Sequence, residues 1–324
     1  MARHKFRALS YSQVLKIRYL KGFTMDTINT RNFIGYSNKP PKVVWPNNAR
    51  IAINFVINYE EGGESCILDG DTQSEHLLSD IIGAAPVVGQ RNLNMESLYE
   101  YGSRVGIHRL LNTFKERNLP ATVFCVGLAL EKNPAVGELM KKANMEISSH
   151  GYRWLDYSCI KEEIEKEHIE KTIEVHQRLL GETPAGIYQG KPSINTRRLV
   201  IETGKFKYDS DAYSDELPYW VGHQNKNHLI IPYTLECNDM RFATANGFSY
   251  GEQFFHYLKD TFDCLYEEGE YAPKMMSIGL HCRLIARPGR IQALKKFLNY
   301  IEPFNDIWVC KREEIAHHWH QNHP

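Results

Sequence analysis

The residues best suited to chemistry in this chain are acidic and basic side chains that follow apolar, strand-like runs. Glu60 and Glu61 follow the run IAINFVINY, while His150 and His281 follow MEISS and MMSIGL. Two adjacent carboxylates repel each other, so one of them can stay basic enough near neutral pH to take a proton from water. Histidine exchanges protons in the same pH range. These residues predict acid–base hydrolysis; the alternative for each one alone is a solvated turn or a structural histidine.

The runs that precede these residues predict buried parallel strands. The stretch over 51–63 is rich in β-branched residues and ends in two glutamates and two glycines, a pattern typical of a buried strand that delivers polar side chains at its end. Further runs of this kind alternate with amphipathic segments such as 161–180. Strands that alternate with helices favour parallel pairing, and about seven such units favour a β/α barrel over an open sheet. The carboxyl ends of barrel strands are where active sites lie.

Other polar residues follow predicted strands and are expected to join the same end. Tyr188 follows AGI, and Asp239 and Arg241 follow IIPYTLECN. For Asp239 and Arg241 a buried structural ion pair is an equal alternative to ligand binding. The acidic, turn-like run over 209–220 predicts either a loop that closes over the site or plain surface. On the charged helix over 161–180, the histidines at 168 and 176 are expected to face water.

Composition limits the classes of partner. The 324 residues carry a formal net charge of zero, with 42% hydrophobic and 24% charged residues, so no overall field attracts nucleic acid or an anionic membrane. Seven scattered cysteines without a CxxC pair favour free thiols in a reducing compartment. No apolar run approaches the roughly 18 residues of a membrane span, and no secretory apolar segment is present. We therefore expect a cytoplasmic protein.

The predicted domain organisation is a basic extension over residues 1–30 and one barrel domain over 31–324. The first 25 residues contain basic but no acidic side chains, which is typical of a surface extension or of an organelle-targeting peptide. The polar, turn-rich stretch over 64–100 is long for a loop inside a compact domain, and such loops usually serve as a lid or an assembly surface.

The order of several segments carries a resemblance to a known family. NYEEG, SSHGYRW, GIYQGKPS, YDSDAYSDELPYW and GLH together resemble the polysaccharide deacetylase (NodB homology) superfamily. Within it the chain resembles the allantoinase branch, which is associated with urate catabolism, over about residues 31–309. The resemblance implies an irregular NodB-like α/β barrel of about seven units. It also implies a homo-oligomer such as a tetramer.

The resemblance also implies roles for individual positions. In the deacetylases the first motif holds a base aspartate and a metal-binding aspartate, and these positions are Glu60 and Glu61 here. The second motif supplies two metal-binding histidines, and these are His150 and Trp154 here. Catalytic zinc normally takes three protein ligands and a water, so we expect no metal; zinc held weakly by Glu61 and His150 is the alternative. The tryptophan ring is suited to stack on a flat heterocycle.

Two further motifs complete the correspondence. The arginine of the third deacetylase motif is replaced by Tyr188, and Lys191 lies nearby as a cation. The last motif keeps its histidine, the general acid of the deacetylases, as His281.

These implications predict a hydrolase that opens the hydantoin ring of allantoin to give allantoate. Either Glu60 or Glu61 activates water and the other positions it or binds a ring nitrogen. His281 protonates the leaving nitrogen or stabilises the oxyanion, and His150 orients water or donates to the carbonyl. The expected substrate-binding residues are Trp154, Tyr188, Lys191, Asp239, Arg241 and Trp220. The alternatives are a metal-dependent chitin or polysaccharide deacetylase and a catalytically silent NodB-like binding module.

Overall fold

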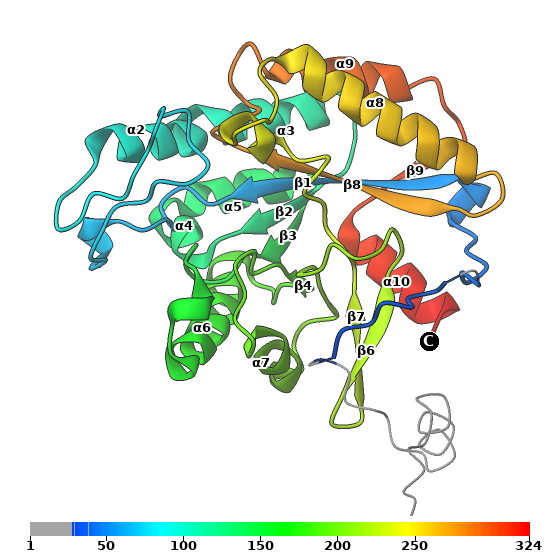
Figure 1. The fold of residues 1–324 in the computed structure, drawn as a ribbon, viewed down its shortest axis with the longest axis horizontal. Helices are drawn as coiled ribbons and strands as arrows, with labels where there is room; N and C mark the ends of the chain where they lie inside the picture. Colours follow the sequence, from blue (N-terminus) through cyan, green and yellow to red (C-terminus); the bar gives the residue numbers. More distant parts are fainter. Residues whose placement is uncertain (1–27, 29, 38) are drawn as a thin grey trace, which may run out of the picture.

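A curled sheet of nine strands, with helices on its outside, forms the body of the protein (Figure 1). The computed structural model describes residues 28, 30–37 and 39–324, so nearly all of the predicted extension over 1–30 lies outside the described residues. The strand order is β6-β7-β5-β4-β3-β2-β1-β8, and β9 pairs with β1. All pairings are parallel except the β6–β7 hairpin. The predicted irregular α/β barrel is confirmed. The strands are β1 (Ile51–Tyr59), β2 (Thr122–Cys125), β3 (Glu146–Ser149), β4 (Gly186–Ile187), β5 (Tyr208–Asp209), β6 (Tyr219–His223), β7 (Lys226–Ile230), β8 (Lys274–His281) and β9 (Ile307–Val309).

The helices surround this sheet, and in Figure 1 α3, α8 and α9 lie above the strands while α6 and α7 lie below them. None of the helices in the described part of the chain has both the length and the apolar character of a membrane span. The seven cysteines are free, as their spacing predicts. The helices are α2 (Leu93–Tyr101), α3 (Ile107–Lys115), α4 (Gly127–Lys132), α5 (Pro134–Lys142), α6 (Glu162–Leu180), α7 (Thr196–Thr203), α8 (Gly251–Glu268), α9 (Ile291–Ile301) and α10 (Arg312–Asn322), with a π-helical turn η3 (Gly102–Gly106) and short 3-10 turns η1 (Pro46–Asn48), η2 (Ile67–Asp69), η4 (Tyr157–Cys159) and η5 (Asp239–Ala243).

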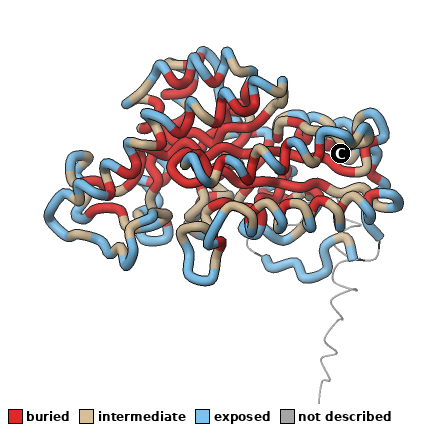
Figure 2. The backbone as a smooth tube through the Cα atoms, turned by 90° about the horizontal axis from the view of Figure 1, so that it is seen from above, coloured by how far each residue is buried: buried red, intermediate tan, exposed pale blue. Residues whose placement is uncertain are grey.

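Strand β1 is buried along its whole length and organises the sheet. One edge pairs with β8 from end to end, while β9 and β2 share the other edge. Because side chains alternate along a strand, its odd-numbered residues pack with the outer helices in the largest apolar cluster. Its even-numbered residues face the barrel interior, where Asn54 and Asn58 bond Arg312 and Tyr233. Figure 2 shows this buried centre surrounded by exposed loops and helix faces.

The first residue of α10 joins the strands inside the barrel. Arg312 is fully buried, and its guanidinium donates to Asn54 Oδ1 at 2.6 Å and to Ser277 Oγ at 3.0 Å. It also donates to Ser210 Oγ at 3.0 Å and to the carbonyl of Pro232 at 2.9 Å. One side chain therefore links β1, β8 and the segments that follow β5 and β7.

One local expectation is wrong and another is incomplete. His176 does not face water but is fully buried on the inner side of α6, because the helix packs against the barrel over more of its circumference than its charge pattern indicates. The acidic run over 209–220 is not only a turn: its end enters the antiparallel hairpin of β6 and β7. Gln224 and Asn225 form the hairpin turn with φ of 46° and 64°, as expected for a two-residue turn with left-handed residues.

Candidate active site

Glu60 continues the inward-facing column of β1 past the end of the strand. Asn54 and Asn58 face the interior, so Glu60, at the same alternation, does too. β8 runs beside β1 with Asn58 opposite His281, which brings this histidine to the same level. The Glu60 side chain is 1% exposed. The strand ends therefore gather a carboxylate and an imidazole inside the mouth of the barrel.

His150 approaches Glu60 from the end of β3. Its Nδ1–H donates to the carbonyl oxygen of Tyr188 at 2.6 Å, and its Nε2 lies 3.2 Å from Glu60 Oε1. The Tyr188 ring stacks on the imidazole with centroids 5.1 Å apart, and its hydroxyl bonds that of Tyr213. Asp211 holds the turn after Tyr188 by accepting two backbone N–H groups at 2.8 Å. Tyr188 thus lies beside the site as a support for His150.

His281 forms a charge-coupled pair with Asp239. Its Nδ1–H donates to Asp239 Oδ1 at 2.6 Å, while Asp239 Oδ2 accepts the backbone N–H groups of His281 and Ile285. The other ring nitrogen, Nε2, lies 3.5 Å from Glu60 Oε1. Burial alone lowers the pKa of His281, but the Asp239 and Glu60 carboxylates outweigh it and raise that pKa to about 9. At neutral pH His281 is therefore a cation that can donate a proton from Nε2.

Arg283 is the component of this site that sequence reasoning missed. It follows β8, is fully buried, and places Nη1 2.7 Å from Glu60 Oε2 and 3.5 Å from Glu61 Oε1. Burial by itself raises the pKa of Glu60, yet Arg283 and His281 hold it well below its usual range. The missed signal is the arginine in CRLIA, directly after the predicted site histidine and otherwise among apolar residues, since such a charge has to be paired where it is buried.

Glu61 points the other way from Glu60. Its carboxylate lies against Gly102 of η3, where an added Cβ would overlap it. Burial and the Glu60 charge raise the pKa of Glu61 to about 7 although Arg283 opposes them. In the same π-helical turn, an added Cβ at Gly106 would overlap the carbonyl of Cys282. The two glycines, four residues apart, allow the helix backbone to pack directly on the site.

Trp154 lies between two cations. The Lys191 Nζ lies 3.4 Å from the centre of the Trp154 ring, and the Arg283 Cζ lies 5.5 Å from it. Tyr99 also packs on the guanidinium, with its ring centre 4.1 Å from Cζ and 6.3 Å from that of Trp154. Burial lowers the pKa of Lys191, although Glu75 and Glu60 oppose it. The structure thus brings Trp154 and Lys191 to the border of the Glu60 cluster.

Two of the expected substrate-binding residues lie in other surroundings. The Arg241 guanidinium lies over the rings of Phe248 and Tyr257, at 4.7 and 5.1 Å. Because Asp239 is bonded to His281, the alternative of a buried Asp239–Arg241 pair is not what the structure shows. Trp220 donates its ring N–H to the carbonyl of His323 and packs on His320 of α10. The structure therefore does not bring Trp220 into the cluster, because the C-terminal helix holds it on β6.

The residues at the strand ends do not make a three-ligand metal site. Within the described residues, no group of three or more His, Cys, Asp or Glu side chains is arranged to hold a metal ion. His150 offers Nε2 and Glu61 a carboxylate, but the second histidine position holds Trp154, and the Arg283 guanidinium already lies against both glutamates. A divalent ion beside a guanidinium would meet like charge. The donor set therefore does not fit the zinc that the resemblance to deacetylases implies.

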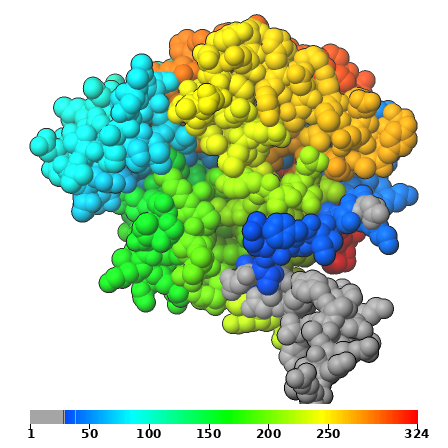
Figure 3. All heavy atoms as spheres, in the orientation of Figure 1, coloured from blue at the N-terminus to red at the C-terminus, as the bar shows by residue number. Residues whose placement is uncertain are grey.

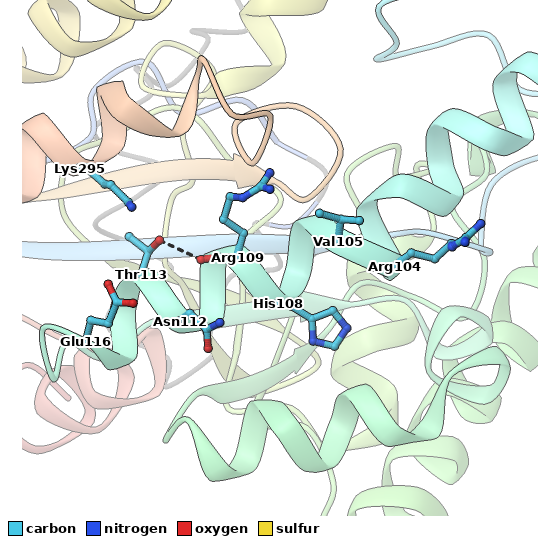
Figure 4. Close-up of a pocket in the computed structure, with 8 residues that line it drawn as sticks. All are labelled: Arg104, Val105, His108, Arg109, Asn112, Thr113, Glu116 and Lys295. Atoms are coloured by element: carbon cyan, nitrogen blue, oxygen red, sulfur yellow. Dashed lines mark hydrogen bonds between the residues drawn. The ribbon is translucent and has the colours of Figure 1, made fainter.

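Two surface features lie apart from the cluster. A hollow of about 450 Å³ runs along η3 and α3 to α9, lined by Arg104, His108 and Lys295 among others (Figure 4). The segment between β1 and α3, coloured cyan, forms a projecting lobe (Figure 3). Ile82, Val88 and Leu93 of this lobe are among the most exposed large apolar residues. None of these residues contacts Glu60 in the structure.

The chain is similar to known proteins along most of its length. The polysaccharide deacetylase family pattern matches residues 95–199. A polysaccharide deacetylase-like protein of Schizosaccharomyces pombe is 44% identical over 315 residues, which are 91% of this chain and 98% of that protein. A probable polysaccharide deacetylase from Pseudomonas aeruginosa PAO1, known from its crystal structure, is 55% identical with a TM-score of 0.89, covering 91% of this chain and 99% of that one. The crystal structure of PuuE allantoinase is 52% identical with a TM-score of 0.89, covering 91% and 98%.

Proposed function

The chain belongs to the polysaccharide deacetylase family, and we propose that within this family of hydrolases it opens the hydantoin ring of allantoin to give allantoate. The observation that carries the proposal is the surrounding of Glu60: two imidazole Nε2 atoms lie at 3.2 and 3.5 Å from Oε1, and a guanidinium lies at 2.7 Å from Oε2. This arrangement supplies a base and an acid without a metal ligand set. The similarity to PuuE allantoinase supports the choice of a cyclic amide.

The reaction is the addition of water to an amide carbonyl. Glu60 takes one proton from the water, and the hydroxide oxygen bonds to the carbonyl carbon to form a tetrahedral oxyanion. The ring C–N bond then breaks, and the leaving nitrogen takes a proton from His281 Nε2. His150 lies on the same Glu60 oxygen and orients the water. Proton transfer from Glu60 back to His281 restores the starting state, so atoms and protons balance.

The roles of the two glutamates follow from their environments. The lowered pKa of Glu60 keeps it ionised, and its position between the two histidines, rather than a high pKa, is the argument for it as the proton acceptor. Glu61 lies 3.5 Å from the same Arg283 Nη1 and accepts the backbone N–H of Glu60, and neither histidine is among its hydrogen-bond or ion-pair partners. We therefore place the base at Glu60 and give Glu61 a role in charge balance.

The test is turnover of allantoin by the purified protein after exhaustive chelation, with allantoate as the measured product. Acetate release from acetylated chitin oligomers is measured in parallel. We expect ring opening that chelation does not reduce. Glu60→Gln should lower kcat by a factor on the order of a hundred to ten thousand, the range of general acid–base catalysis.

Glu64→Gln is the matched control. Glu64 is buried on the same turn, but its carboxylate accepts the backbone N–H of Gly62 instead of contacting the histidines. Its turnover should stay near that of the wild type. Acetate release that disappears on chelation would give the metal-dependent deacetylase precedence. Ligand binding without turnover of either substrate, unchanged by Glu60→Gln, would favour a silent binding module.

A further inference from the structure

The Arg283 guanidinium occupies the centre of the charge distribution at this site. Its Nη1 faces both Glu60 and Glu61, and its Nε donates to the carbonyl of Leu78 at 3.0 Å. The side chain is fully buried. A buried cation persists only when nearby charges and hydrogen bonds compensate for its lost hydration. Arg283 therefore forms buried ion pairs with both glutamates, and these compensate for its lost hydration.

Two aromatic rings lie within cation–π distance of this guanidinium. Tyr99 lies at 4.1 Å and Trp154 approaches at 5.5 Å, and the two ring centres are 6.3 Å apart. A guanidinium is well suited to such stacking because it is flat and weakly hydrated. Trp154 occupies the position where the resemblance to deacetylases implies a metal-binding histidine. The ring that removes a metal ligand therefore also packs against a cation provided by the chain.

The hydrogen-bonding capacity of Arg283 is not exhausted. Its Nη2, like Glu61 Oε1, is buried without a hydrogen-bond partner. A guanidinium keeps its charge at every pH at which the protein folds. A metal ion, in contrast, is bound reversibly and can be removed by chelation. Arg283 thus provides a permanent positive charge whose free donors face the same small region as the two carboxylates.

We propose that Arg283 is a positioning residue that takes the place of the divalent cation of metal-dependent hydrolases, holding Glu60 ionised and oriented and excluding metal ions from the two glutamates. The inference deepens the proposed amide hydrolysis and rests on it for the turnover readout alone. Exclusion of metal can be measured on protein without any substrate. A failure of this inference can therefore be told apart from a failure of the proposed allantoin hydrolysis.

The first measurement compares metal binding by the wild type and Arg283→Met. Methionine keeps an apolar stem but removes the charge, so Glu60, Glu61 and His150 become available to a cation. Titration with Co²⁺, followed by its visible absorption and by calorimetry, should show at least tenfold tighter binding in the variant. Equal affinity in the two proteins would overturn the proposal even if allantoin is not the substrate.

The second measurement follows turnover and its rescue. Arg283→Met should lower kcat/KM on the order of a thousandfold, comparable to loss of a main electrostatic contact at an active site. Added guanidinium should restore part of the rate in a saturable way, whereas ammonium at equal ionic strength should not. A merely structural role would give no such selectivity. A loss of less than about tenfold, with no guanidinium effect, contradicts the proposal.

Arg50→Met is the matched control. Arg50 lies at the opposite end of β1, pairs with Asp306 at 2.9 Å and Glu270 at 3.5 Å, and stacks over Tyr266. Like Arg283 it has two carboxylate partners and an aromatic ring, but its side chain is 36% exposed and lies away from the site. Its variant should keep wild-type turnover and Co²⁺ affinity, and tighter Co²⁺ binding by it would mean that the effect is general. If Arg283→Met does not fold, Arg283→Gln, which is neutral but polar, enters the same two comparisons.

Discussion

Replacing Glu60 and Glu61 one at a time by glutamine should change the stability of the protein in opposite directions. The two residues are adjacent, of the same type and almost fully buried. Their electrostatic environments differ, since the pKa of Glu60 is well below its usual range and that of Glu61 is raised to about 7. A buried acid with a raised pKa destabilises the fold when it ionises, and one with a lowered pKa stabilises it.

The size of the Glu61 effect follows from its pKa. A rise from 4.5 to about 7 corresponds to a free energy of about 3 kcal/mol. The unfolded chain ionises above pH 4.5, so this destabilisation is absent below that pH, grows between pH 4.5 and 7, and is complete above pH 7. Glu61→Gln cannot ionise. At pH 8 it should therefore be more stable than the wild type by up to about 3 kcal/mol, with little difference at pH 4.5.

Glu60 has the opposite sign. Its stabilising contribution is present above pH 4.5 and is lost as the pH falls through its lowered folded-state pKa. Glu60→Gln leaves Arg283 and the His281 cation without their shared partner, which should destabilise the protein at pH 8 by about 3 kcal/mol or more, as when a buried ion pair is broken.

The assay is urea unfolding followed by tryptophan fluorescence for the wild type and both variants at pH 5, 6.5 and 8. The unfolding midpoint of Glu61→Gln should rise relative to that of the wild type as the pH increases, at an unchanged m value. A Glu61→Gln midpoint that moves in parallel with the wild type would refute the reasoning. Equal destabilisation by the two substitutions would do the same, because it would mean that shape and not charge decides.

Three other outcomes are expected. In the wild type, kcat should fall as the pH rises through about 9 because His281 loses its proton there. Asp239→Asn should move this alkaline limb of the pH–rate profile toward neutral pH. If the limb does not move, the Asp239–His281 pair is not its source. Trp154→Ala should raise KM or lower kcat relative to Trp154→Phe, and unchanged kinetics at all allantoin concentrations would defeat the role of the ring. Trp154→His should gain zinc affinity when combined with Arg283→Met, because the guanidinium otherwise repels the ion. Gly106→Ala should lower the thermal unfolding midpoint by several degrees, because the added Cβ would overlap the Cys282 carbonyl. Such overpacking typically costs about 1 to 3 kcal/mol. A calorimetric midpoint equal to that of the wild type would contradict this close approach.

The gathering of Glu60, His150 and His281 could be predicted because parallel strands present their ends at one side of a barrel. Which glutamate joins the histidines was also encoded in the sequence. The polar residues Asn54 and Asn58 mark the inward face of an otherwise apolar strand, and their alternation continues to Glu60 and not to Glu61. Counting this period would have decided between the two.

Other parts of the site depend on tertiary contacts that a linear pattern does not contain. Arg283 lies beyond the end of β8, where the chain turns, so no strand or helix period predicts its direction. The engagement of Trp220 by the C-terminal helix joins residues 103 positions apart. The burial of His176 depends on how α6 sits on the barrel. Propensity describes each segment alone, whereas these outcomes depend on which other segment arrives beside it.

The hydrogen bonds of Arg312 have a consequence for folding during synthesis on the ribosome. Its bond to Asn54 joins residues 258 positions apart. At about 5 to 20 residues per second, the ribosome adds Arg312 roughly 10 to 50 seconds after Asn54. During synthesis the earliest strand is thus exposed with its polar interior unsatisfied, and chaperones have that interval in which to bind it. A circular permutant that places α10 before β1 should shorten the interval, and its nascent chains should resist protease at shorter lengths.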